Sequence, residues 1–566
     1  MKKLIYTAII TLISALGFAQ TLQQAITKTE NERFADAASD FNTLITKEPA
    51  KGENYFYSGE NYFKKGEIDS ANIFFAKGIE LNATNPLNYV GLGKVLLSKN
   101  NINDAKTQFF KAASIAQNKN AEVMRRTAEA WISTDNKNPD EAIVQANNAI
   151  KIDPKNPENY ILLGDAQLEK NPADGSGPIK SYQLATTLNP KSARGILREG
   201  KLYQRGRNYQ LALEKYKAAL TIDPTFAPAY REIAELYFLV GQNSKSIENW
   251  KKYLELNNSD YARYRFMSAL FKNKQFTEAV VEYENLKKSN FNNLYLERLA
   301  AFCYYQMGDK VDKEAYNKGM NAINTFFTKG GTTFKYIADD FKYKGFLLSK
   351  TGKDSLGVIE MEKAIQLDAT MAGEIYSFMA NAANKAKKYD KVITFLEKKI
   401  AIDTTKMDNN DWFTLGKAYF FTAQTKLLEG INQKDAKVKA QKEAEAMPNF
   451  VKADSSFSKL VRLTPVWPTA HFWRGRSSSN LDPKNEKWLA KPHYEKVLLL
   501  VKPEERATTY KSNVIEASEY LGDYYVNSKE NKNPEKAKEY WTAVKELDPA
   551  NVKAKAFFAP PKPGGK

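Results

Sequence analysis

The sequence predicts an all-α protein built as a helical solenoid, and three observations support this fold class. The segments NNAIKIDP, EKYKAALTIDP and WTAVKELDP repeat one short helix with the same Asp-Pro stop. Ala37, Ala71 and Ala105 are spaced 34 residues apart, and this period fits a unit of two helices. A chain of 566 residues is also too long for one ordinary core, whereas an array of stacked repeats has no such limit.

Each predicted unit consists of a first helix, a turn and a second helix. The second helix that ends at Pro224 places Ala212, Tyr216 and Ala219 at i, i+4 and i+7, which is one stripe of an α-helix. Small residues allow two helices to cross closely, and an aromatic side chain fills the adjacent groove. The proline then ends the helix because it lacks an amide donor. The small residue at the centre of the first helix is usually a glycine: Gly59, Gly93, Gly164, Gly200, Gly345, Gly416, Gly475 and Gly522.

These units resemble the tetratricopeptide repeat. The residues that match the family pattern are Trp412, Leu415, Gly416 and Tyr419 in a first helix, and Ala212, Tyr216, Ala219 and Pro224 in a second helix. The resemblance covers about residues 22 to 552, in about fourteen units. It implies a right-handed superhelix whose first helices line a concave groove, and it implies no reaction.

The N-terminal segment, residues 1–19, reads as a cleaved signal peptide. MKK is a basic region, LIYTAIITLISAL is an apolar run, and Gly17-Phe18-Ala19 is a small-residue cleavage site. We therefore expect the mature protein to begin at Gln20 and to lack a membrane span. The only cysteine is Cys303, so we expect neither a lipoprotein anchor nor an internal disulfide.

Departures from the repeat predict the domain organisation. We expect an N-terminal lobe over residues 20–327, a hinge over 328–333 that contains Lys329-Gly330-Gly331, and a C-terminal lobe over 334–552. A helical insertion is expected over 425–449, and its lysine, glutamate and alanine residues favour helix without an apolar face. A solvated spur is the simpler interpretation of the insertion, and an arm that contacts a partner is the alternative.

The C-terminal residues 553–566 are predicted to be a disordered tail, because FFAPPKPGGK cannot bury a core. A second possibility concerns Phe557 and Phe558, which either cap the last helix or insert into a neighbouring molecule.

The net charge of +18 does not predict a nucleic-acid partner. Only 15 of the 84 basic residues are arginine, and lysine spread along helices is first of all a solvated surface. An exported protein also rarely meets nucleic acid. We expect no nucleic acid among the partners.

No motif in the sequence predicts catalysis. The two histidines, His471 and His493, have no accompanying set of metal ligands. Gly91-Leu92-Gly93 lacks the third glycine of a phosphate-binding loop, and no nucleophile elbow is present. We expect a protein that is not an enzyme and that needs no cofactor or metal.

Two groups of residues are candidates for binding a partner in the groove that the resemblance implies. Arginine grips carboxylates with two hydrogen bonds, and aromatic side chains beside arginine are typical of interface hot spots. For the first group, internal pairing with Glu232 and Glu235 is an equally good explanation. We name the groups the arginine cluster (Arg194, Arg198, Lys201, Arg205 and Arg231) and the aromatic cluster (Phe413, Lys417, Phe420, Phe472 and Arg476).

The sequence therefore predicts a non-catalytic, periplasmic protein-interaction scaffold. By analogy with other helical-repeat adaptors, its partners are expected in the cell envelope, in an outer-membrane assembly or secretion machine. The alternative is a carrier for peptidoglycan or another glycan, with groove aromatics stacking on the sugars.

Overall fold

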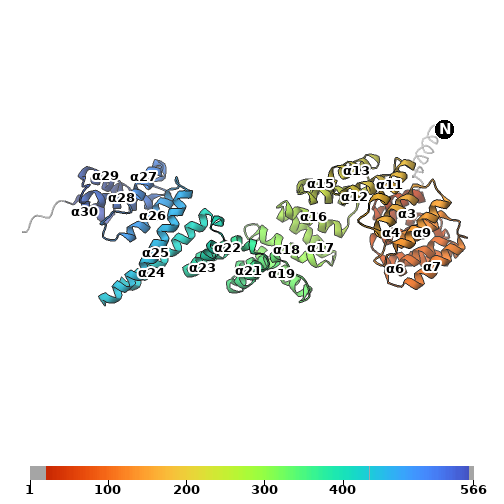
Figure 1. Ribbon diagram of the computed structural model, residues 1–566, viewed down its shortest axis with the longest axis horizontal. Coiled ribbons are helices and arrows are strands. Elements are labelled where there is room, and N and C mark those ends of the chain that lie inside the picture. The colour runs from red at the N-terminus through yellow and green to blue at the C-terminus, as the bar shows by residue number, and fades with distance from the viewer. Residues whose placement is uncertain (1–20, 432–433, 560–566) are drawn as a thin grey trace, which may run out of the picture. The chain divides into compact units, whose positions relative to one another are not determined.

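The structure is a computed structural model that describes residues 21–431 and 434–559, and over these residues it contains helices and no strand (Figure 1). The helices follow one another as antiparallel pairs joined by short turns, as a solenoid of two-helix repeats requires. The predicted fold class, an all-α solenoid of tetratricopeptide-type repeats, is confirmed. The predicted signal peptide, residues 1–19, lies outside the described residues.

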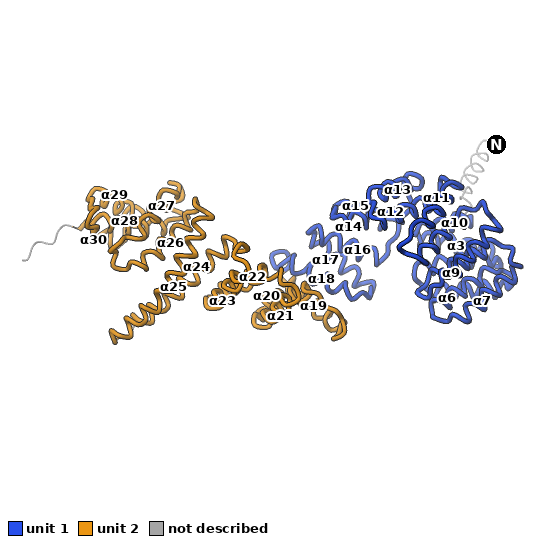
Figure 2. The backbone as a smooth tube through the Cα atoms, viewed as in Figure 1, with its two compact units in different colours: residues 1–312 blue, residues 313–566 orange. Residues whose placement is uncertain are grey.

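The chain divides into two compact units (Figure 2). Unit 1 ends at Asp312 and unit 2 begins at Lys313. The hinge predicted at residues 328–333 therefore falls inside unit 2. There Lys329 and Gly330 form the end of a helix, and the hydroxyl of Tyr336 donates hydrogen bonds to the carbonyls of Phe327 (3.0 Å) and Gly331 (2.9 Å).

Unit 1 contains α2 (Leu22–Glu30), α3 (Phe34–Lys47), α4 (Gly52–Lys65), α5 (Ile68–Leu81), α6 (Pro86–Ser98), α7 (Ile102–Ile115), α8 (Ala121–Ala130), α9 (Pro139–Ile152), α10 (Pro157–Lys170), α11 (Ser176–Leu188), α12 (Ala193–Arg205), α13 (Tyr209–Ile222), α14 (Ala227–Leu239), α15 (Asn243–Leu256), α16 (Asp260–Lys272), α17 (Phe276–Lys288) and α18 (Leu294–Met307).

Unit 2 contains α19 (Ala315–Gly330), α20 (Ala338–Lys350), α21 (Asp354–Leu367), α22 (Ala372–Lys385), α23 (Tyr389–Ile402), α24 (Asn409–Ile431), α25 (Ala436–Leu463), α26 (Pro468–Leu481), α27 (Lys491–Leu500), α28 (Lys511–Asn527), α29 (Pro534–Leu547) and α30 (Val552–Phe558). Short 3₁₀ turns η1 (Ala369–Met371), η2 (Thr404–Lys406) and η3 (Pro503–Glu505) interrupt this series.

Asparagine and proline set where many of these helices begin. Asn85, Asn138, Asn156 and Asn533 are N-caps whose side chains accept a hydrogen bond from a backbone amide of the first turn. In each case proline follows at the first helical position, where its missing N–H costs nothing and its fixed φ suits the helix. The repeated Asn-Pro of the sequence is thus a start signal.

The pairs are held together by glycine–aromatic crossings. A Cβ atom added to Gly200 in α12 would lie 2.6 Å from Cε1 of Tyr216 in α13, which is closer than atoms can pack. Tyr216 is fully buried, and its hydroxyl donates to Gln204 at 2.8 Å. Equivalent contacts join Gly59 to Phe75, Gly93 to Phe109, Gly164 to Tyr182, Gly416 to Phe457, Gly475 to Tyr494 and Gly522 to Trp541. Glycine is required at these positions because the partner ring occupies the space of a side chain.

The predicted insertion, residues 425–449, continues two helices beyond the ordinary repeat length. α24 has 23 residues and α25 has 28, compared with 14 in α23. Lys442 of α25 forms ion pairs with Glu429 of α24 (3.0 Å) and with Glu445 (3.1 Å). The part of the insertion that the structure describes is therefore a pair of long helices joined by surface charges.

The predicted disordered tail, residues 553–566, is corrected at its start. Residues up to Phe558 continue α30, and the ring of Phe557 stacks on Trp541 of α29 at 5.8 Å between centroids. Burial of this ring against Trp541 explains the helix, and it corresponds to the alternative in which the two phenylalanines cap the array. Residues 560–566 lie outside the described residues.

Gly200→Leu should destabilise the protein by about 1 to 3 kcal/mol or more, because the leucine overpacks the crossing with Tyr216. Gly206→Leu is a matched control, since a Cβ at Gly206 meets only backbone carbonyls at 3.5 Å or more and the residue is exposed. Urea unfolding followed by far-UV circular dichroism measures the difference. Equal unfolding midpoints for the two variants would contradict the crossing model.

Candidate functional site

The first helices of unit 1 share an internal network of charged side chains. Lys64 of α4 lies 2.7 Å from Glu30 of α2 and 3.4 Å from Glu129 of α8. Arg126 of α8 pairs with Glu129 at 2.8 Å, and Arg194 of α12 pairs with Glu30 at 3.2 Å. We call these five residues the inner ion-pair network; their side chains are at most 23% exposed. Acids and bases alternate, so each charge has an opposite neighbour.

Asn31 and Glu32, which follow α2, form side-chain contacts with residues about two hundred positions later in the sequence. Arg231 of α14 pairs with Glu32 at 2.5 Å, and the hydroxyl of Tyr253 in α15 donates to the same carboxylate at 2.9 Å. The amide of Asn31 donates to Asp223 at 2.6 Å. Unit 1 therefore closes on itself through its first helix.

The pKa directions agree with this pairing. Burial alone would raise the pKa of Glu30, but Lys64 and Arg194 outweigh it and hold the pKa far below its usual range. For Glu122 of α8 burial also opposes ionisation, yet Arg126 and Arg125 lower its pKa to about 2. These carboxylates stay ionised because cations surround them.

Most of the arginine cluster is neutralised within the chain. Arg194 and Arg231 belong to the contacts described above, and Arg198 pairs with Asp165 at 2.8 Å. Lys201 lies 3.3 Å from Glu232, which also accepts from Arg231 at 3.1 Å. Arg205 is exposed at the end of α12. The internal pairing with Glu232 that the sequence left open is what the structure contains, whereas Glu235 pairs with Arg265 instead.

The aromatic cluster contains a lysine in a different situation. The ammonium group of Lys417 in α24 lies 5.2 Å from the ring centroid of Phe413, 5.9 Å from Phe421 and 5.4 Å from Trp473 of α26. Within residues 21–431 and 434–559, no carboxylate forms an ion pair with Lys417, and burial lowers its pKa. A half-buried cation surrounded by ring faces is therefore available for an anionic group.

The other members of the aromatic cluster support this site in different ways. Phe420 and Phe472 are only 1% and 5% exposed, so they form the packed floor and offer no ring face to a sugar. Arg476 forms a bidentate ion pair with Glu516 of α28, and its guanidinium lies 4.7 Å from the ring of Phe472. Arg476 is thus neutralised, whereas Lys417 is the cation of the cluster without an acidic partner in the described structure.

We name the Lys417 surface from the side chains that surround the ammonium group: Phe413, Lys417, Phe421 and Trp473. The rings provide apolar contact area and electrostatic attraction for the cation. A carboxylate from another molecule would restore part of the solvation that Lys417 loses on burial. The chemistry of this site is recognition of an acidic group beside an apolar one.

Two further findings concern metal binding and membrane insertion. In the described part of the chain, no group of three or more His, Cys, Asp or Glu side chains is placed to hold a metal ion. None of the described helices combines the length and the apolar character that crossing a membrane takes.

Sequence reasoning missed the inner ion-pair network and the contact between Lys417 and Trp473 of the next helix pair. The network joins residues up to 164 positions apart, such as Glu30 and Arg194, so no local pattern reveals it. For the Lys417 surface a signal was present. Phe413, Lys417 and Phe421 are spaced by four residues, which places them on one helix face.

Solved structures similar to this chain are helical-repeat proteins. The C-terminal part of a TPR repeat-containing protein from Cytophaga hutchinsonii is 29% identical with a TM-score of 0.40, and the match covers 52% of this chain and 99% of that chain. A tetratricopeptide repeat protein from Parabacteroides merdae is 17% identical with a TM-score of 0.32, over 45% of this chain and 98% of that chain. A thermophilic TPR protein from Thermus thermophilus is 19% identical with a TM-score of 0.27, over 39% and 99%. No family model matches the chain.

Acid should weaken unit 1 through Glu122. Its pKa of about 2 lies below the usual 4.5, so the ionised carboxylate stabilises the fold above about pH 4.5, and this stabilisation is lost as the pH falls toward 2. The full effect corresponds to about 3 kcal/mol. Glu122→Gln lacks the titrating group, so its free energy of unfolding should fall less over this window.

Urea unfolding of the mature chain at a series of pH values from 7 to 3 measures this slope. Glu80→Gln is the control, because Glu80 is an exposed partner of Lys77 on α5 and should leave the slope unchanged. Identical slopes for Glu122→Gln and the unaltered protein would rule out this role of Glu122.

Proposed function

We propose that this tetratricopeptide-repeat chain is an exported scaffold of the cell envelope, and that unit 2 binds a partner protein at the Lys417 surface. Stacked helix pairs of this kind are in general protein-interaction scaffolds, since they present extended surfaces and contain no reaction chemistry of their own. The signal-peptide pattern of residues 1–19 supports export, and an outer-membrane assembly or secretion machine is the setting that we propose.

The observation that carries the proposal is the unpaired charge of Lys417. Most of the other predicted groove cations have internal carboxylates, as Arg198 has Asp165 and Arg476 has Glu516, and Arg205 is exposed to solvent. A buried charge without a partner costs free energy, which a bound carboxylate recovers. The cation–π contacts offset this cost by about 0.5 to 2 kcal/mol, so they hold the ammonium group in place without satisfying its hydrogen bonds.

The geometry favours a partner segment that carries an acidic side chain next to an apolar one. The acidic group would accept from the ammonium of Lys417, and the apolar group would contact Phe413 or Trp473. Tryptophan and other buried aromatics are the residues on which interface affinity most often depends. Such a site binds a partner and carries out no chemical reaction.

The long helices α24 and α25 are a second contact region for the same partner. Leu428 and Ile431, toward the end of α24, are 59% and 64% exposed. Two apolar side chains one turn apart on an exposed helix are consistent with an arm that contacts a partner rather than with a purely solvated spur. This assignment belongs to the proposal and extends the Lys417 surface along the same helix.

Lys417→Glu should lower capture of the envelope partner at least tenfold, because it replaces the attractive charge by a repulsive one. The measurement is crosslinking in intact cells followed by affinity purification and quantification of the copurified protein. Lys459→Glu is the matched control, since Lys459 is an exposed lysine of α25 in the same unit. Unchanged capture by Lys417→Glu would overturn the proposed surface.

Export makes a separate prediction. The mature protein should be recovered from the periplasmic fraction, with a mass that corresponds to an N-terminus at Gln20. Mass spectrometry of the intact protein from fractionated cells measures both properties. Recovery of the uncleaved chain in the cytoplasmic fraction would overturn the envelope location while leaving the Lys417 surface to its own test.

A further inference from the structure

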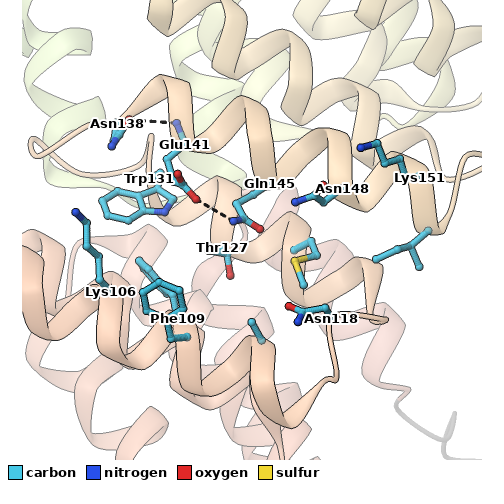
Figure 3. A pocket seen from close by; sticks show the side chains of 14 residues that line it. Lys106, Phe109, Asn118, Thr127, Trp131, Asn138, Glu141, Gln145, Asn148 and Lys151 are labelled. Carbon is cyan, nitrogen blue, oxygen red and sulfur yellow. Dashed lines mark hydrogen bonds between the residues drawn. The ribbon is translucent and has the colours of Figure 1, made fainter.

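A hollow of about 710 Å³ opens between α7 and α9 of unit 1 (Figure 3). It arises where the repeat is incomplete. α8, the first helix of its pair, has 10 residues, whereas α6 and α10 have 13 and 14. Residues 131–138 run as turns where a full-length first helix would continue.

The two long walls of the hollow come from α7 and α9, which are second helices of the repeat. Its base is formed by Met124, Thr127 and Trp131 of α8 and its C-terminal end, the helix that also carries Arg126 and Glu129 of the inner ion-pair network. Figure 3 shows Phe109 and Lys106 on the α7 side, Thr127 and Trp131 at the back, and Gln145 on the α9 side. Because its two long walls are second helices, the hollow differs from the groove of first helices that the family resemblance implies.

The two long walls of the hollow differ in chemistry. Apart from Lys106, the α7 wall is apolar, and Phe110 on it is 75% exposed although it is a large aromatic residue. The α9 wall carries Glu141, Gln145 and Asn148, and the amide of Gln145 donates to Glu141 at 2.9 Å. One wall can therefore receive side chains while the other forms hydrogen bonds.

The polar side chains of the α9 wall form a row along the helix axis. Glu141, Gln145 and Asn148 are four and three residues apart, which is about 5 to 6 Å along the helix axis. From Glu141 to Ile152 the helix rises about 16 Å, which an extended segment covers in about five residues.

The charge of the lining favours an acidic ligand. Lys106 and Lys151 line the hollow near its two ends and are exposed, and within the described residues neither has an ion-pair partner. Glu141 is the acid of the lining, and Gln145 already donates to it. Two unpaired cations on opposite sides of the hollow attract a segment with acidic residues at both of its ends.

We propose that this hollow binds an extended peptide segment of about five residues, with acidic residues at its ends and an apolar side chain against Phe110. Asn148 and Gln145 hydrogen-bond its backbone, and Lys106 and Lys151 bind the terminal acidic side chains. The segment belongs to a protein partner of unit 1. The proposal goes beyond the Lys417 surface of unit 2, and it stands independently of the location of the protein.

The probe is a pool of fluorescein-labelled pentapeptides with aspartate at both ends and varied central residues, titrated against the full mature chain by fluorescence anisotropy. Binding should favour leucine, isoleucine or phenylalanine at the centre. Phe110→Ala should lower the affinity at least tenfold, whereas Ile73→Ala, which removes a comparably exposed apolar side chain from α5, should leave it unchanged. Lys417→Glu should also leave it unchanged, which separates this test from that of the proposed function.

Charge reversal makes the test specific. Lys106→Glu combined with Lys151→Glu should abolish binding of the aspartate pool and create binding to a matched pool with lysine at both ends. The proposal would be overturned by no binding of any pentapeptide, by equal binding to Phe110→Ala, or by displacement of the bound pool with a neutral oligosaccharide at equal concentration. Far-UV circular dichroism of each variant shows that the fold is retained.

Discussion

Close crossing of a glycine by an aromatic ring is the contact on which the structure depends. Gly200 and Tyr216 show the arrangement: the ring occupies the volume of the missing side chain, so the two helices can pack closely. The same contact recurs in both units, so the pairs that contain it can stack on their neighbours in a similar way. The structure can then depart from the repeat only at the ends of the array, at insertions and at irregular helix pairs.

Close stacking also determines which charged side chains pair with one another. First helices that lie side by side bring their polar faces together, and in unit 1 these faces carry Glu30, Lys64 and Glu129 in alternating sign. The charges of such a face are neutralised by internal pairing, so it is poorly suited to bind another charged molecule. A binding surface requires the opposite situation, a charge that the stacking leaves without a partner, and Lys417 is in this position.

The fold was predictable from the sequence because its determinants are local. Gly200 lies 16 residues before Tyr216, Pro224 ends the same helix, and all three belong to one repeat. The candidate site was less predictable because the contacts that neutralise its cations join residues far apart in the sequence. Family positions identified Arg231 as a groove residue, but only the closed shape of unit 1 places Glu32 beside it. The early end of α8 was not predicted either. Its sequence, AEVMRRTAEA, lacks the central glycine that identifies the other first helices, so its shorter length could not be recognised from the repeat.

Closure of unit 1 through Glu32 changes how that unit should unfold. A linear repeat array behaves as a one-dimensional system, in which terminal repeats fray first and interior repeats follow independently. The bonds of Glu32 to Arg231 and Tyr253 remove the free end on the N-terminal side, because α2 has neighbours both along the chain and across it. Unit 1 is therefore expected to melt as one cooperative body, with the first helix as strongly protected from exchange as the middle of the array.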